Sequence, residues 1–147
     1  MQDQSPIFHF PIRIYWEDTD AGGIVFYANY LKFFERARTE WLRAAGVGQQ
    51  QLREEAGGMF VVTHSTVRYV RPARLDDELI VTAQLTEKRP ASLTIGQQAL
   101  SKTVQGAQGS SAGAHDLLCE GSVRIGWVNA NTLRPARIPT HILDLLK

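Results

Sequence analysis

The stretch EDTDAGGIVFY places three acidic residues within four positions, directly before two glycines and an aromatic run. Carboxylates this close together can bind a metal ion, cap a helix, or supply one carboxylate as a nucleophile or general base. A calcium loop that starts at Asp18 fails, because its fifth position is Gly22 and its twelfth, which should be glutamate, is Asn29. The chain also contains no His-x-x-x-His or Cys-x-x-Cys pair. We therefore expect neither a metal ion nor another cofactor.

Two interpretations of the acidic cluster remain, a polar turn that caps a helix and a site for chemistry. Asp and Thr are good N-cap residues, and acids suit the positive end of a helix dipole. A cap needs only one acid, however, and Gly22 and Gly23 let the backbone approach a ligand closely. The free amides of a following helix would also form an oxyanion site. The residues alone leave both interpretations open.

The elements that must position this cluster follow from the spacing of apolar residues. Residues 8–16 alternate between apolar and polar, which predicts a half-buried strand, and Pro11 favours an edge position. Apolar residues recur at spacings of three and four from Tyr27 to Ala45, which predicts one long helix. The remaining expected elements are a polar turn at 49–55, strands near 59–70, 79–86, 92–103 and 117–127, a Gly/Ser/Ala-rich mobile hairpin loop at 104–115 and a short helix from 140.

This order of elements predicts a single α+β domain, residues 1–147, with one helix covering a five-stranded sheet. The net charge of +1, from 16 basic and 15 acidic residues, gives no reason to expect a nucleic-acid partner. The single cysteine, Cys119, excludes an internal disulfide and fits a reducing compartment. We see no secretory signal and no apolar run of the roughly 20 residues that span a membrane. We therefore expect a cytoplasmic protein, and the exposed sheet edges favour a homo-oligomer.

Four segments of the chain together resemble a known family. RIYWEDTDAGG, YLKFFERARTEWLR, VRYVRPARLDDEL and the closing RPARIP read in register with the 4-hydroxybenzoyl-CoA thioesterase family, over nearly the whole chain. The resemblance is greatest to the YbgC-type acyl-CoA thioesterases found beside the Tol-Pal genes of Gram-negative bacteria. It implies the hotdog fold, an antiparallel five-stranded sheet wrapped around one long central helix. It also implies homodimers joined edge to edge, often paired into homotetramers.

The resemblance further implies an acyl-CoA thioesterase whose acting carboxylate, as nucleophile or general base, falls on Asp20. The second catalytic position falls on Tyr27, where many members of the branch carry His. We expect the backbone amide of Tyr27, near the helix start, to be the oxyanion donor. The branch is compatible with a short- or long-chain acyl-CoA or an acyl-carrier protein as the substrate. It is also compatible with a role in lipid metabolism and with peripheral association at the inner membrane.

Four further residues are candidates for substrate binding: Gly23, Asn29, His64 and Arg74. Gly23 allows close backbone approach, whereas Asn29 either binds substrate or caps the helix. His64 shares one side of its strand with Thr66 and Arg68, where it either borders a ligand channel or faces solvent. Arg74 either meets the CoA phosphates or belongs to a solvated basic edge. The alternatives to a thioesterase are a non-catalytic acyl-binding module and a hotdog dehydratase that uses His64.

Overall fold

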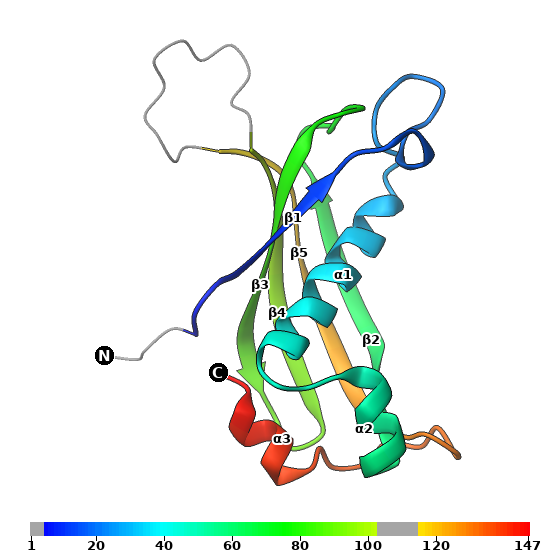
Figure 1. Ribbon diagram of the computed structural model, residues 1–147, viewed down its shortest axis with the longest axis vertical. Helices are drawn as coiled ribbons and strands as arrows, with labels where there is room; N and C mark the ends of the chain where they lie inside the picture. The colour runs from blue at the N-terminus through cyan, green and yellow to red at the C-terminus, as the bar shows by residue number, and fades with distance from the viewer. Residues whose placement is uncertain (1–4, 103–114) are drawn as a thin grey trace.

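The computed structural model describes residues 5–102 and 115–147, and Figure 1 shows one long helix against a curved sheet. The five strands form a single antiparallel sheet in the order β1-β3-β4-β5-β2. The predicted fold class is therefore confirmed. The elements are β1 (Phe8–Arg13), a 3-10 turn (Trp16–Asp18), α1 (Asn29–Ala44), α2 (Gln49–Ala56), β2 (Gly58–Tyr69), β3 (Glu78–Lys88), β4 (Ser92–Ser101), β5 (Asp116–Asn129) and α3 (Thr140–Leu145).

Most predicted elements are found where the apolar pattern placed them. β1 is an edge strand, which explains how it accommodates Pro11. The alternation of apolar and polar residues expected over 8–16 ends before residue 16, because Trp16 lies in the 3-10 turn and is 81% exposed. The polar turn expected at 49–55 is helix α2, which ends in the left-handed Gly57. The predicted connection falls on residues 104–115, of which 104–114 lie outside the described part of the chain.

The buried face of α1 differs in detail from the predicted stripe. Leu31 is 43% exposed, whereas Phe33 and the guanidinium-bearing Arg38 are buried. The buried stripe follows Tyr30, Phe34, Ala37 and Trp41, and each residue step turns the helix by about 100°. Leu31 lies one step after Tyr30, on the flank of the helix, and is exposed there, whereas Arg38 lies seven residues further along the same flank and is buried against Gln97.

The core consists of two apolar clusters with a polar layer between them. One cluster surrounds Phe33 and Phe34 at the start of α1, and the other surrounds Trp41 and Leu42 at its end. Between them, Arg38 donates from Nη1 to Oε1 of the buried Gln97 at 2.9 Å. Gln97 in turn donates to the carbonyls of Phe34 and Thr82 at 3.0 and 3.1 Å. The polar layer thus fixes α1 in register on the sheet. No helix in the described ranges is long and apolar enough to cross a membrane.

Candidate active site

The loop between β1 and α1 folds back on itself as a tight turn that presents Asp20. Thr19 pairs with Val25, the Asp20 amide donates to the Ile24 carbonyl at 2.9 Å, and the Gly23 amide donates to the Asp20 carbonyl at 3.0 Å. Gly23 has φ +80°, a left-handed conformation that side-chain-bearing residues rarely adopt. The turn therefore requires a glycine at this position.

The acids of the cluster have different environments. Asp18 is buried, its Oδ2 accepts from the Tyr15 amide at 2.9 Å, and its carbonyl accepts from the Phe26 amide at 3.0 Å. Asp20 is exposed, and its Oδ1 accepts from the Gly22 amide at 2.8 Å. Within the described residues, Oδ2 of Asp20 has no hydrogen-bond partner. Asp18 thus braces the turn, whereas Asp20 keeps one carboxylate oxygen available.

The start of α1 leaves backbone donors available beside this turn. The Asn29 and Tyr30 amides donate to the carbonyls of Phe26 and Tyr27. Across residues 5–102 and 115–147, the amides of Tyr27 and Ala28 have no acceptor. Free amides at a helix N-terminus are suited to stabilising a developing oxyanion.

The interpretation of the cluster as a helix cap is wrong, because no side chain in the described residues caps α1. Of the two alternatives for Asn29, capping the helix is wrong for the same reason. Asn29 lies inside the first helical turn, and its Nδ2 reaches back to donate to the Asp18 carbonyl at 2.9 Å. The side chain of Asn29 therefore closes the loop onto the helix.

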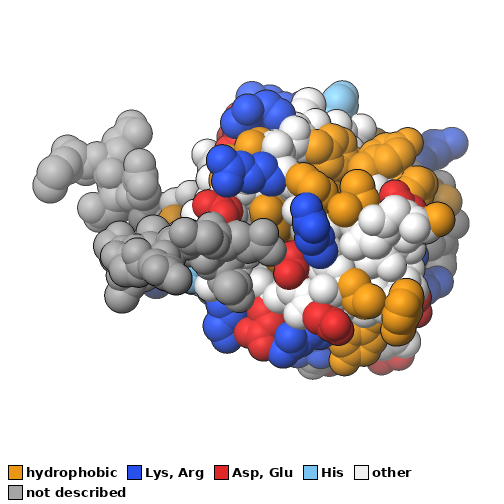
Figure 2. Space-filling view, turned by 90° about the horizontal axis from the view of Figure 1, so that it is seen from above, with side chains coloured by type: hydrophobic (Ala, Val, Ile, Leu, Met, Phe, Trp, Pro, Cys, Tyr) orange, Lys and Arg blue, Asp and Glu red, His pale blue; other side chains and the backbone are white. Residues whose placement is uncertain are grey.

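The ring of Tyr27 belongs to an aromatic group at the same end of the molecule. Tyr27 is 61% exposed and meets Tyr69 edge-on, with ring centroids 5.7 Å apart, and Phe26 at 5.0 Å. Figure 2 views this end and shows apolar side chains gathered beside basic ones. The sequence reasoning missed Tyr69 and Phe26. Tyr69 has the same strand parity as Val67, which packs on the core beneath α1, and that parity was the available signal.

The connection between β2 and β3 contacts the Asp20 turn directly. Val25 donates to the Ala73 carbonyl at 2.9 Å, Leu75 donates to the Gly23 carbonyl at 3.4 Å, and Ile24 bridges to Arg74. Arg71 is 3.6 Å from Asp116, but the Arg74 side chain has no ion pair among the described residues. Both arginines line a small cavity of about 210 Å³. The structure therefore places Arg74 beside Gly23, with its charge available.

His64 lies elsewhere. It is exposed in the middle of β2, with Nδ1 3.3 Å from Thr63 Oγ1. It lies five positions before Tyr69, which is about 16 Å along a strand. The structure thus brings Asp20, Gly23, Tyr27, Asn29 and Arg74 to one end of the molecule and leaves His64 apart.

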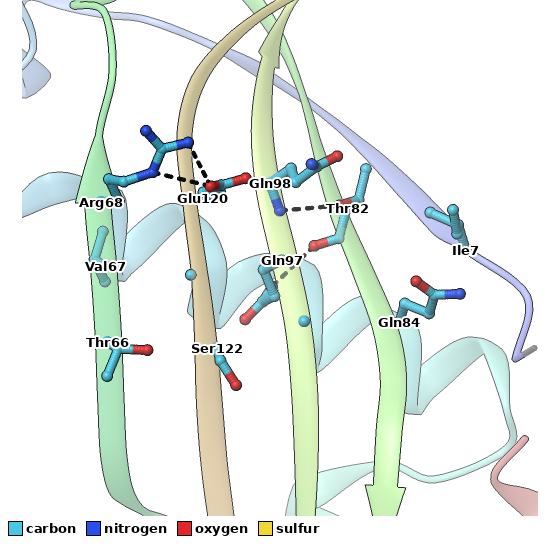
Figure 3. Close-up of a pocket in the computed structure, with 12 residues that line it drawn as sticks. Ile7, Thr66, Val67, Arg68, Thr82, Gln84, Gln97, Gln98, Glu120 and Ser122 are labelled. Atoms are coloured by element: carbon cyan, nitrogen blue, oxygen red, sulfur yellow. Dashed lines mark hydrogen bonds and ion pairs between the residues drawn. The ribbon is translucent and has the colours of Figure 1, made fainter.

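A cavity of about 640 Å³ forms a trough lined mainly by polar residues on the sheet face opposite α1 (Figure 3). In it, Arg68 Nη2 lies 2.6 Å from Glu120 Oε1, so the strongest charges already neutralise each other. The residues of the Asp20 turn do not line this trough. Within the described ranges, no three His, Cys, Asp or Glu side chains gather closely enough to hold a metal ion. The candidate active site is therefore the Asp20 turn together with the start of α1.

The chain is similar to known proteins over nearly its whole length. The profile of the thioesterase-like superfamily matches residues 14–146. The chain is 39% identical over 141 residues to the acyl-CoA thioester hydrolase YbgC of Escherichia coli, covering 96% of each chain. It is 37% identical over 135 residues to the acyl-CoA thioesterase YbgC of Haemophilus influenzae, covering 92% of this chain and 90% of that one.

The fold is also that of solved thioesterases. A 4-hydroxybenzoyl CoA thioesterase complexed with 4-hydroxybenzoyl CoA superposes with a TM-score of 0.84 at 21% identity, covering 96% of this chain and 99% of that one. At that identity the likeness concerns the fold alone. The profile match and the two YbgC relatives go further, and together they show that this chain belongs to the thioesterase-like superfamily of hotdog-fold proteins.

Proposed function

We propose that the protein hydrolyses the thioester of an acyl-CoA to a free acid and a thiol, with Asp20 as the acting carboxylate. The observation that carries this proposal is that, among the residues the structure describes, Oδ2 of Asp20 has no partner and two backbone amides at the adjoining start of α1 have no acceptor. The names of the YbgC relatives support the substrate class.

The chemistry needs only these groups. As general base, Asp20 takes a proton from a water molecule whose oxygen attacks the thioester carbonyl carbon. The resulting oxyanion accepts hydrogen bonds from the Tyr27 and Ala28 amides, and collapse of the tetrahedral intermediate expels the thiolate, which receives the proton from Asp20. As nucleophile, Asp20 instead attacks the carbonyl carbon and the C–S bond breaks, which leaves a mixed anhydride and expels the thiolate. Water then hydrolyses the anhydride, which releases the acid and restores the Asp20 carboxylate, and the proton from that water is taken up by the thiolate. Both routes make the Asp20 carboxylate essential.

The surroundings of the turn provide for substrate binding. Gly23 exposes backbone at the turn, and beside it Arg74, which has no ion pair within the described part of the chain, offers a cation for a phosphate of CoA. The exposed rings of Phe26, Tyr27 and Tyr69 offer an apolar surface for the acyl group.

The protein is also expected to be a homodimer or homotetramer. β2 is an edge strand of 12 residues without proline, so its outer side offers unpaired backbone groups. The opposite edge, β1, has only six residues and contains Pro11. We therefore infer that β2 joins the sheets of two protomers. Sedimentation at micromolar protein tests this inference, and a purely monomeric species contradicts it.

The activity itself is tested by release of free thiol from acyl-CoAs of short, long and aromatic acyl groups. We expect hydrolysis of at least one class without added metal. Absence of thiol release across the panel, combined with retained binding of the acyl-CoAs, would identify a non-catalytic binding module. Within one protomer, His64 lies about 16 Å along β2 from Tyr69, so a single chain does not support the dehydratase alternative.

A further inference from the structure

The backbone of Ala73 connects the two halves of the proposed site. Ala73 is fully buried in the connection between β2 and β3. Its carbonyl accepts from the Val25 amide at 2.9 Å, and Val25 pairs with Thr19, next to Asp20. Its own amide donates to the Tyr30 hydroxyl at 3.1 Å. One residue thus holds the returning arm of the Asp20 turn on one side and the first turn of α1 on the other.

Tyr30 is itself held rigidly. It is 3% exposed, and its ring packs against Phe33 at 5.7 Å and Tyr69 at 5.8 Å between centroids. Its backbone amide donates to the Tyr27 carbonyl at 3.3 Å. Burial raises the pKa of the Tyr30 phenol above its ordinary value, so the hydroxyl stays protonated at neutral pH. A neutral phenol oxygen can accept the Ala73 hydrogen bond without the cost of a buried charge.

We propose that Tyr30 is a positioning residue for the reaction, whose hydroxyl fixes the Asp20 turn relative to the amides at the start of α1. This inference rests on the proposed function, because it concerns the separation between the attacking group and the oxyanion site. That separation must be held closely for thioester attack. Removing the hydroxyl leaves the buried Ala73 amide without its acceptor and removes one link between the turn and the helix, while the bond from Asn29 to the Asp18 carbonyl remains.

The kinetic test is Tyr30→Phe, which keeps the ring and removes only the hydroxyl. We expect kcat to fall on the order of tenfold while KM changes by less than about twofold, because attack geometry is lost and ground-state binding is kept. The matched control is Ile95→Val in the distal apolar cluster, which lowers stability without touching the site. A folded Tyr30→Phe with the kcat of the wild type overturns the proposal. If wild type is active, that result leaves the proposed function intact, whereas an inactive wild type refutes both.

Amide hydrogen exchange provides a second test on the wild-type protein, which does not depend on the folding of a variant. The Ala73 and Val25 amides should exchange slowly and with the same opening equilibrium, as one unit. In Tyr30→Phe, exchange at Val25 should accelerate by roughly tenfold or more, while Ile95 stays protected. Exchange of the wild-type Ala73 amide at the rate of an exposed peptide overturns the proposal.

Discussion

Alanine substitutions at Gly22 and Gly23 should separate the stability of the turn from its chemistry. A Cβ at Gly23 would meet no described atom within 4 Å, so the cost of Gly23→Ala to the stability of the fold is the strain of alanine at φ +80°. That strain costs about 1–2 kcal/mol. For a chain of this size it should lower Tm by about 3–6 °C. Gly46→Ala is the matched control, since Gly46 has φ +95°, an equally open Cβ position and no part in the site.

Gly22→Ala acts on the carboxylate instead. The backbone of Gly22 is not in the left-handed region, but its Cβ would lie 3.2 Å from Oδ1 of Asp20. The Asp20 side chain must then move by a few tenths of an ångström or turn away from the Gly22 amide. Displacing an attacking group by 1 Å can cost about 10² in rate, so we expect a loss of roughly tenfold in kcat. The expected change in Tm is small.

Thermal unfolding and thiol release measured on the three variants check this prediction. Gly23→Ala and Gly46→Ala should lose similar stability, and Gly46→Ala should keep the kcat of the wild type. Gly22→Ala should keep its Tm and lose rate. A Gly22→Ala variant with full kcat would refute the reasoning, because it would show that the position of the Asp20 carboxylate does not limit the reaction.

Two further predictions concern the core. Burial raises the pKa of the Cys119 thiol to about 12. At pH 8, native protein should therefore resist thiol reagents, whereas unfolded protein should react fully. Fast reaction of Cys119 in the native protein would contradict the structure. Because the unfolded thiol ionises near pH 9 and the native one near 12, stability should fall as pH rises through that window, and alkaline denaturation of wild type and Cys119→Ala checks this. Arg38→Met should lower the free energy of unfolding by about 1–3 kcal/mol, since it leaves Gln97 Oε1 without its donor. Adding Gln97→Leu should recover part of that loss in denaturant unfolding, and additive losses would contradict a shared polar layer.

The elements that position the site were predictable because their apolar periods are regular. Leu79, Val81, Ala83 and Leu85 are all buried on one side of β3, as their alternation indicates. Pro11 marked an edge strand, and the resemblance of the motif segments located Asp20. The strand, its edge position and the motif each depend on residues close together in the sequence, so the sequence pattern can predict them.

The features that the sequence did not predict depend on contacts between residues that are far apart in the chain. Nothing near Arg38 in the sequence indicates that Gln97 on β4 lies opposite it, so the sequence alone would place this charged residue on the solvent face of α1. The partnership of Tyr30 with Ala73 joins residues 43 positions apart. The displacement of His64 from the site likewise follows from the direction in which β2 runs. Pairings of this kind require the folded chain.

The central claim is that one acid among three neighbours carries the reaction, and a comparison of isosteric amide variants tests it most directly. The variants are Asp20→Asn and, as the matched exposed neighbour, Glu17→Gln. Both should fold with the Tm of the wild type, because neither carboxylate is buried. The account predicts that Asp20→Asn lowers kcat by at least about 10² while Glu17→Gln retains nearly full activity. Full activity in Asp20→Asn would contradict the account.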